Sequence, residues 1–244
     1  AFAPDIVVLW NMSKLASGMV MEAQKLAPVL LYHLMDEWIT TFPSGNGLPQ
    51  FWARPARSRW ARALKPLCRP LFRRLFCPDV ADWRPANAVF ASNALRDFVE
   101  RRGVHFQRAL VSPITYDPAF FAGDWTRPPR NGRSVRFLWA GRLCAGKGLH
   151  TTLDALDRLW QKRADGWELD FCGPIEKQTL EGTLNPRLER APWRAAVRYL
   201  GPVAHSAMPA QYRDHDVFLF TSEVHEGMPG VIVEAFAAAM PVIA

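Results

Sequence analysis

The last part of the chain, VFLFTSEVHEGMPGVIVEAFAAAMPVIA at residues 217–244, decides the fold. Its first four residues are apolar and predict a short buried strand, which the polar pair Thr221 and Ser222 ends. A loop rich in Gly and Pro follows, then a small-residue helix through Glu234 and a further strand at residues 241–244. Strand, loop, helix and strand in this order are typical of a parallel sheet flanked by helices. The stretch therefore predicts an α/β protein.

The loop and the helix of this stretch also predict a ligand site. Glu226 and Glu234 lie eight positions apart, on either side of the junction between loop and helix. A helix that begins in this way offers free backbone N–H groups and the positive end of its dipole to an anion. A carboxylate on the loop can reach a polar group of the ligand, and one in the helix can accept two hydrogen bonds from a vicinal diol such as ribose.

Short apolar strands alternate with helices along the rest of the chain. In the first part we expect strands at residues 5–10, 28–34, 87–91 and 107–111, helices at 14–26 and 93–102, and a helix at 55–76 that Pro66 and Pro70 break. In the second part we expect strands at residues 135–140, 167–171 and 197–200, helices at 149–163 and 206–213, and an irregular helical region at 176–190.

Pro and Gly divide the chain into two domains. They interrupt any regular element between residues 112 and 133. We therefore expect a first domain at residues 1–117, a linker at 118–133 and a second domain at 134–244. The chain begins at Ala1 and ends at Ala244 inside a predicted strand, so we expect both domains to be incomplete.

A second loop, GRLCAGKG at residues 141–148, follows the strand at 135–140. Arg142 offers a forked pair of donors and Lys147 a compact positive charge. The glycines around them allow the backbone to approach a phosphate closely. The string also matches the first seven positions of a Walker A loop. At the eighth position, where that loop has Ser or Thr, Gly148 lacks the hydroxyl that ligates Mg²⁺. A P-loop NTPase, which would hydrolyse NTP with Mg²⁺, remains an alternative.

Taken with Gly201-Pro202-Val203, the two loops resemble the retaining nucleotide-sugar glycosyltransferases of family 4, also called group 1. That family has the GT-B fold, two facing Rossmann-like domains. The resemblance implies a metal-independent enzyme of the hexosyltransferase type that moves a sugar from a nucleotide-diphospho sugar to a hydroxyl with retention, in glycan or glycolipid assembly. It implies no cofactor other than the donor, and a glycan, a lipid-linked or a small hydroxyl compound as acceptor. We expect residues 1–244 to be inactive on their own.

The resemblance also assigns roles to the residues of the two loops. Arg142 and Lys147 neutralise the departing diphosphate, Glu226 contacts the transferred sugar near its reacting face, and Glu234 binds the ribose. The remaining donor-lining positions are Gly141, Gly227, Met228, Pro229 and Gly230, of which Pro229 has no N–H to offer.

The acceptor side departs from the family's pattern. Met35 stands where the family has a His, and a thioether can donate neither a proton nor a strong hydrogen bond. By strand alternation His33 points to the same face and could substitute, or it could be a core histidine. Asp36 and Glu37 are further candidates for contacting an acceptor hydroxyl. This departure keeps a second function open, a nucleotide-sugar-binding module with impaired catalysis.

We predict no metal site. The string Asp214-His215-Asp216 directly precedes the strand at residues 217–220, so we interpret it as a turn and the start of that strand. The cysteines show no C-x-x-C spacing and are expected to be reduced thiols.

A basic segment accounts for the excess of positive charge, +7 for the whole chain. Between Trp38 and Pro78 there is no Asp or Glu, and aromatic residues and leucines alternate with cations. The cations are Arg54, Arg57, Arg59, Arg62, Lys65, Arg69, Arg73 and Arg74. The pattern is typical of an amphipathic helix that contacts an anionic membrane, or of a helix whose apolar side packs on the domain core. We expect no nucleic-acid partner, and a cytoplasmic location with peripheral contact to the inner membrane face.

Overall fold

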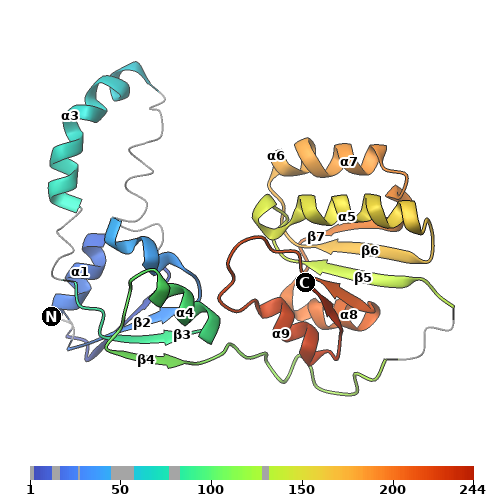
Figure 1. Ribbon diagram of the computed structural model, residues 1–244, viewed down its shortest axis with the longest axis horizontal. Coiled ribbons are helices and arrows are strands. Elements are labelled where there is room, and N and C mark those ends of the chain that lie inside the picture. The colour runs from blue at the N-terminus through green and yellow to red at the C-terminus, as the bar shows by residue number, and fades with distance from the viewer. Residues whose placement is uncertain (1–2, 13–16, 27, 45–57, 77–82, 128–131) are drawn as a thin grey trace. The chain divides into compact units, whose positions relative to one another are not determined.

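A computed structural model describes residues 3–12, 17–26, 28–44, 58–76, 83–127 and 132–244 (Figure 1). The chain divides into two compact units, each with its own sheet of parallel strands. Unit 1 comprises Ala1–Pro113 and Glu226–Met228, and unit 2 comprises Ile114–His225 and Pro229–Ala244. The predicted α/β class is thus confirmed.

The strands of unit 1 follow one another across the sheet in chain order. They are β1 (Ile6–Trp10), β2 (Val29–Leu34), β3 (Asn87–Phe90) and β4 (Arg108–Val111). The helices described in this unit are α1 (Ser17–Leu26), the 3₁₀-helix η1 (Trp38–Ser44), α3 (Arg59–Phe76) and α4 (Asn93–Arg101). Crossovers between parallel strands are right-handed as a rule. Because the strands follow in one direction across the sheet, the connecting segments are expected on one face.

The core of unit 1 agrees with this topology. Tyr32 of β2 and Phe90 of β3 are fully buried, together with Val20 of α1 and Leu95 of α4. The side chains that alternate with these on the strands point to the other face, where Trp10 is 61% exposed. Of the described helices, α1, η1 and α4 therefore pack on one face of this sheet.

Unit 2 has the strand order β7-β6-β5-β8-β9. These strands are β5 (Val135–Ala140), β6 (Trp167–Cys172), β7 (Val197–Gly201), β8 (Val217–Leu219) and β9 (Val242–Ile243). The chain moves outward from β5 to β7, returns to lie beside β5 as β8, and then continues in the opposite direction. Because the direction of travel reverses, right-handed crossovers place helices on both faces.

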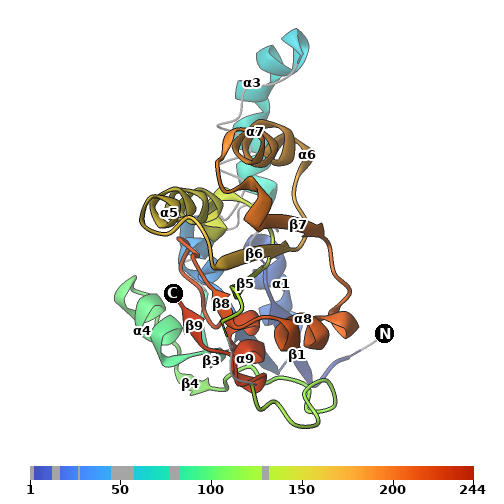
Figure 2. The same ribbon diagram turned by 90° about the vertical axis from the view of Figure 1, so that its right-hand side faces the viewer.

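Two hydrophobic cores lie on the two faces of this sheet. On one face are α5 (Leu149–Lys162), α6 (Lys177–Thr179) and α7 (Asn185–Arg190), and on the other are α8 (Met208–Asp214) and α9 (Gly230–Ala237) (Figure 2). Trp139 of β5 packs with Leu153 on the first face, whereas its neighbour Leu138 packs with Tyr212 and Ala235 on the second. Unit 2 is therefore a three-layer sandwich.

The predicted break in the basic segment was wrong, because α3 runs without interruption through Pro66 and Pro70. Each proline removes one backbone hydrogen bond. The two prolines are four positions apart, so the lost bonds lie on the same side of the helix and the bonds of the other sides remain. Residues 54 and 57, which the sequence assigned to the same basic segment, lie outside the described residues.

The irregular helical region predicted at residues 176–190 is confirmed. It consists of α6, a π-helix at Leu180–Leu184 and α7. In the part of the chain that the structure describes, no helix has both the length and the apolar character needed to cross a membrane.

Candidate functional site

The topology of unit 2 places a switch point between β5 and β8, where the order of the strands reverses. In an open parallel sheet, ligands bind outside the carboxyl ends of the strands at such a point. Two loops begin there, residues 141–148 after β5 and residues 220–225 after β8. The first is the Gly-rich loop that the sequence singled out.

The two loops are held together at Gly148 and Thr221. Gly148 has a left-handed backbone (φ 73°), and a Cβ atom on it would lie 1.8 Å from the carbonyl oxygen of Thr221. The Thr221 hydroxyl lies 3.2 Å from the carbonyl oxygen of Lys147 and accepts a hydrogen bond from Trp139 Nε1 at 3.1 Å. This contact allows only glycine at position 148.

Backbone hydrogen bonds add to this attachment. The carbonyl oxygen of Gly146 accepts from the amides of Glu223 (3.0 Å) and Val224 (3.2 Å). The hydroxyl of Thr151, in the first turn of α5, donates to the Glu223 carboxylate. The two loops therefore form one ordered platform at the switch point.

The predicted leaving-group cations both come from this platform. The amide of Gly141 donates to the carbonyl of Cys172 (3.0 Å), and that of Leu143 to Pro174 (2.9 Å), so the loop runs on beside the end of β6. Leu143 is fully buried, whereas Arg142 is exposed and has no hydrogen bond or ion pair among the described residues. Lys147 is half-buried, at the end of a 3₁₀ turn.

Glu234 lies on α9, and its carboxylate is held by side chains of unit 2. Its side chain is 19% exposed. One carboxylate oxygen accepts from the Tyr212 hydroxyl at 2.8 Å, and the other lies 3.2 Å from His205 Nε2. Burial, and then the neighbouring Glu234 carboxylate, raise the pKa of Tyr212, so the phenol remains a donor. Tyr212 and His205 therefore hold the carboxylate of Glu234 in a fixed orientation.

Sequence reasoning missed Tyr212 and His205 as partners of Glu234. Tyr212 stands 22 positions before Glu234, on a different helix, and no spacing rule joins them. Only the packing of α8 beside α9 on one face of the sheet brings the phenol and the carboxylate together. The sequence signal available was an apolar helix position occupied by a residue with a hydroxyl, which needs a partner when buried.

Glu226 does not belong to the same unit as Glu234. Glu226–Met228 are part of unit 1, whereas Pro229 and Gly230 begin α9 in unit 2. Within unit 1 the Ser92 hydroxyl donates to the carbonyl oxygen of Gly227 at 2.5 Å. A Cβ atom on Gly227 would lie 2.1 Å from the carbonyl oxygen of Met35, so this position also requires glycine.

The histidine and the methionine of the predicted acceptor side have different surroundings. The His33 ring stacks on the exposed Trp10, with ring centroids 4.2 Å apart. Met35, just beyond the end of β2, packs against the hydrophobic core of unit 1. The expectation that the two side chains share a face is wrong, because strand alternation no longer applies past Leu34.

The two acidic residues that follow also differ. The Asp36 carboxylate accepts from the amide of Trp38 (3.0 Å) and from Asn11 Nδ2 (2.8 Å). It caps the 3₁₀-helix η1, an element that the periodicity did not predict, although an Asp that binds the amide two residues on is a known turn signal. Glu37 is exposed.

Asp214, His215 and Asp216 lie at the opposite, amino end of β8. The interpretation as a turn and a strand start is confirmed, since α8 ends at Asp214 and β8 begins at Val217. The two oxygens of the Asp216 carboxylate bind Arg133 at 2.6 and 3.1 Å. A cavity of about 290 Å³ also opens near this end, lined by residues that include Arg133, Phe137 and Trp167, and it is remote from the switch point.

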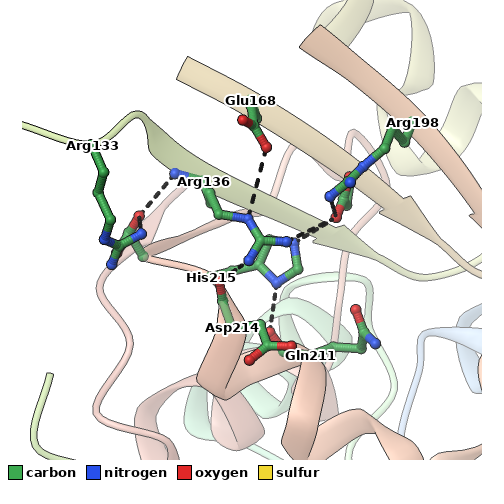
Figure 3. A network of polar contacts seen from close by, with 9 residues as sticks. Arg133, Arg136, Glu168, Arg198, Gln211, Asp214 and His215 are labelled. Carbon is green, nitrogen blue, oxygen red and sulfur yellow. Dashed lines mark hydrogen bonds and ion pairs between the residues drawn. The ribbon is translucent and has the colours of Figure 1, made fainter. Parts of the chain in front are cut away.

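His215 belongs to a buried network of polar groups (Figure 3). Its Nε2 lies 2.9 Å from the carboxylate of Asp170, and its Nδ1 lies 2.6 Å from the carbonyl oxygen of Gln211. Arg198 on β7 donates twice to Asp170, at 2.7 Å each. Burial by itself raises the pKa of Asp170, but the hydrogen bonds from Arg198 and His215 outweigh it and lower that pKa.

Comparison with known proteins shows what the second part of the chain and its fold resemble. Residues 134–244 match the family of glycosyl transferases group 1. HepE of Anabaena, solved with UDP and glucose, has a TM-score of 0.65 and 18% identity over 98% of this chain and 59% of its own. A glycosyltransferase from Rickettsia africae has a TM-score of 0.64 and 14% identity over 98% of this chain and 57% of its own.

A third similar structure is sucrose-phosphate synthase from Thermosynechococcus elongatus, with a TM-score of 0.59 and 15% identity over 93% of this chain and 53% of its own. The chain thus spans little more than half the length of these proteins. No curated protein matches it. At such identities the likeness establishes the fold, which is that of GT-B glycosyltransferases. Residues 134–244 of this chain are similar to the group 1 glycosyl transferase family.

Proposed function

We propose that the protein to which this chain belongs is a glycosyltransferase that moves a sugar from a nucleotide-diphospho sugar to a hydroxyl acceptor, with retention and without a metal ion. One observation carries the proposal. The loop with Arg142 and Lys147 lies at the switch point of unit 2, joined to the loop after β8 through Gly148 and Thr221. Retention is proposed from the family resemblance, since the anomeric outcome does not follow from the geometry of unit 2.

The chemistry requires cations at this place. When the bond between the anomeric carbon and the phosphate oxygen breaks, negative charge grows on the departing nucleoside diphosphate. We assign its stabilisation to Arg142 and Lys147. A preorganised donor aimed at developing charge contributes about 10²- to 10³-fold in rate.

Glu234 supplies the orientation of the donor in this proposal. Tyr212 donates to one carboxylate oxygen, so the other, beside the exposed His205, is directed to the hydroxyls of the ribose. Glu226 is assigned to the transferred sugar, and the backbone of residues 227–230 to the sugar and the diphosphate. Because HepE binds UDP and glucose, uridine nucleotide sugars are the first donors to test.

The experiment is a thermal-shift screen of UDP-, GDP- and ADP-sugars, followed by calorimetric titration of the best nucleoside diphosphate. Losing a charged hydrogen bond costs about 1.5–3 kcal/mol, so Arg142→Ala should weaken binding by roughly 10- to 100-fold. The matched control is Arg158→Ala, which removes an exposed cation from α5 and should leave the affinity unchanged. Equal affinity of Arg142→Ala and the original chain would remove the role assigned to Arg142.

A second candidate function is a nucleotide-sugar-binding module without catalysis. Met35 favours it, because this side chain stands at the position of the family's histidine and packs into the core. The acceptor-side candidates that remain are His33, Asp36 and Glu37, with Asp36 already engaged by Trp38 and Asn11. Release of nucleoside diphosphate from the full-length protein with glycan, lipid-linked and small hydroxyl acceptors decides between the two. Tight binding without release would favour the module, and transfer that persists in EDTA supports metal independence.

A further inference from the structure

We propose that α3 is a membrane-binding helix that lies in the surface of an anionic bilayer. The side chains used are those described between Arg59 and Pro70. Trp60, Leu64 and Leu67 have the spacing i, i+4, i+7, which places them within about 60° of one another around the helix at 3.6 residues per turn. They form a single apolar stripe.

The stripe is uncovered. Trp60 is 81% exposed, Leu64 54% and Leu67 74%. None of the described side chains of α3 belongs to the hydrophobic core of unit 1, so the other sequence interpretation, a helix packed on the domain core, is not what the structure shows. Scattered exposed apolar residues are ordinary on protein surfaces, but an aligned stripe of large ones marks an interaction site.

The charge around the stripe indicates which surface it binds. Arg59 and Arg62 are exposed; at 3.6 residues per turn Arg62 lies opposite the stripe and Arg59 lies on its flank. Between Trp38 and Pro78 the sequence has no Asp or Glu that could neutralise them. An apolar stripe with Trp and Leu beside a purely cationic face is the composition of a helix that inserts its apolar side at the boundary of headgroups and acyl chains. Trp is also the residue that membrane interfaces favour.

The test is sedimentation of the full chain with vesicles of phosphatidylcholine, with and without phosphatidylglycerol. We expect binding to the anionic vesicles, reduced by salt, and much weaker binding to pure phosphatidylcholine. Arg59→Gln combined with Arg62→Gln should weaken binding by roughly 30-fold, from the usual contribution of each cation near an anionic leaflet. The triple change Trp60→Ser, Leu64→Ser, Leu67→Ser should remove binding to vesicles even at low salt.

Controls separate this inference from effects on folding and on the proposed donor site. Arg158→Gln with Lys162→Gln removes the same charge from exposed positions of α5 and should bind vesicles like the original chain. Circular dichroism and the melting temperature should be unchanged in the α3 variants, because their altered side chains are exposed. The inference is overturned if either α3 variant sediments like the original chain. It is equally overturned if the chain ignores anionic vesicles and binds single-stranded RNA through the same cations.

Discussion

Gly148 shows how a single residue sets the geometry of the candidate site. Its left-handed backbone costs an L-amino acid about 1–2 kcal/mol, and a Cβ atom would overlap the carbonyl oxygen of Thr221, at 1.8 Å. The carbonyl oxygen is backbone and cannot rotate away. A larger residue here must therefore separate the loop of Arg142 and Lys147 from the loop after β8.

We expect Gly148→Ala to lower the free energy of unfolding by roughly 2–5 kcal/mol, the sum of backbone strain and overpacking. Urea denaturation followed by circular dichroism measures this. Gly182→Ala is the matched control, because a Cβ atom there meets nothing within 4 Å and the backbone is helical. That substitution should be neutral or slightly stabilising. Equal stability of the two variants would contradict the close contact at Gly148.

At the scale of elements, Arg127 joins the ends of two helices in unit 2. Its Nε donates to the carbonyl oxygen of Ala239 (3.0 Å), and Nη2 donates to those of Tyr212 and Ala238 (3.0 Å each). Nη1 donates to the carbonyl oxygen of His215. These carbonyls belong to the last turns of α8 and α9 or follow them, where helices leave acceptors unpaired and favour a cation.

Arg127→Ala should therefore destabilise unit 2 by about 2–4 kcal/mol, because several partly buried carbonyl groups lose their donor together. Arg127→Lys should recover only part of this, since one ammonium group cannot reproduce a planar fork with donors in fixed directions. Thermal melting measures both. In Arg158→Ala, which removes an exposed arginine of α5, the melting temperature should not change. A full recovery by lysine would show that charge, rather than geometry, is what α8 and α9 require.

At the scale of the whole fold, Asp170 of β6 links the edge strand β7 to the end of α8. Arg198 comes from β7 and His215 from the segment between α8 and β8 (Figure 3). The pKa of Asp170 is lowered on folding, so its ionised form stabilises the fold above the ordinary aspartate pKa of about 3.9. That stabilisation is lost as pH falls through the lower value of the folded state.

Asp170→Asn should cost roughly 3–5 kcal/mol near neutral pH, because it removes the buried carboxylate that accepts two hydrogen bonds from Arg198. The difference from the original chain should shrink as pH falls below about 4, where the carboxylate of the unfolded chain takes up a proton, and it should vanish below the lower pKa of the folded state. Denaturation at a series of pH values measures this difference. Asp154→Asn, at an exposed ion pair with Arg187, should show a difference below about 1 kcal/mol. A difference for Asp170→Asn that stays constant down to pH 2 would contradict the role of its ionisation.

The positions of the strands could be predicted from the sequence to within a few residues. Short apolar runs bounded by Gly, Pro and polar residues are local signals, and β5 at Val135–Ala140 agrees with its prediction at both ends. The cap of α4 is another local signal, since Ser92 accepts from the amide of Leu95, three residues on. The spacing of Gly141, Arg142 and Lys147 after a strand likewise indicated the loop that the structure places at the switch point.

Only the tertiary structure decided the strand order, and with it where that switch point lies. Strand order depends on which edge each crossover reaches, and no short stretch of sequence encodes this. The same applies to the contacts of Glu234 with Tyr212 and of Ser92 with Gly227, which join residues 22 and 135 positions apart. Such pairs form through the packing of whole elements. The amino-acid sequence therefore determined the elements and the candidate residues, and the packing of the sheets determined which of those residues meet.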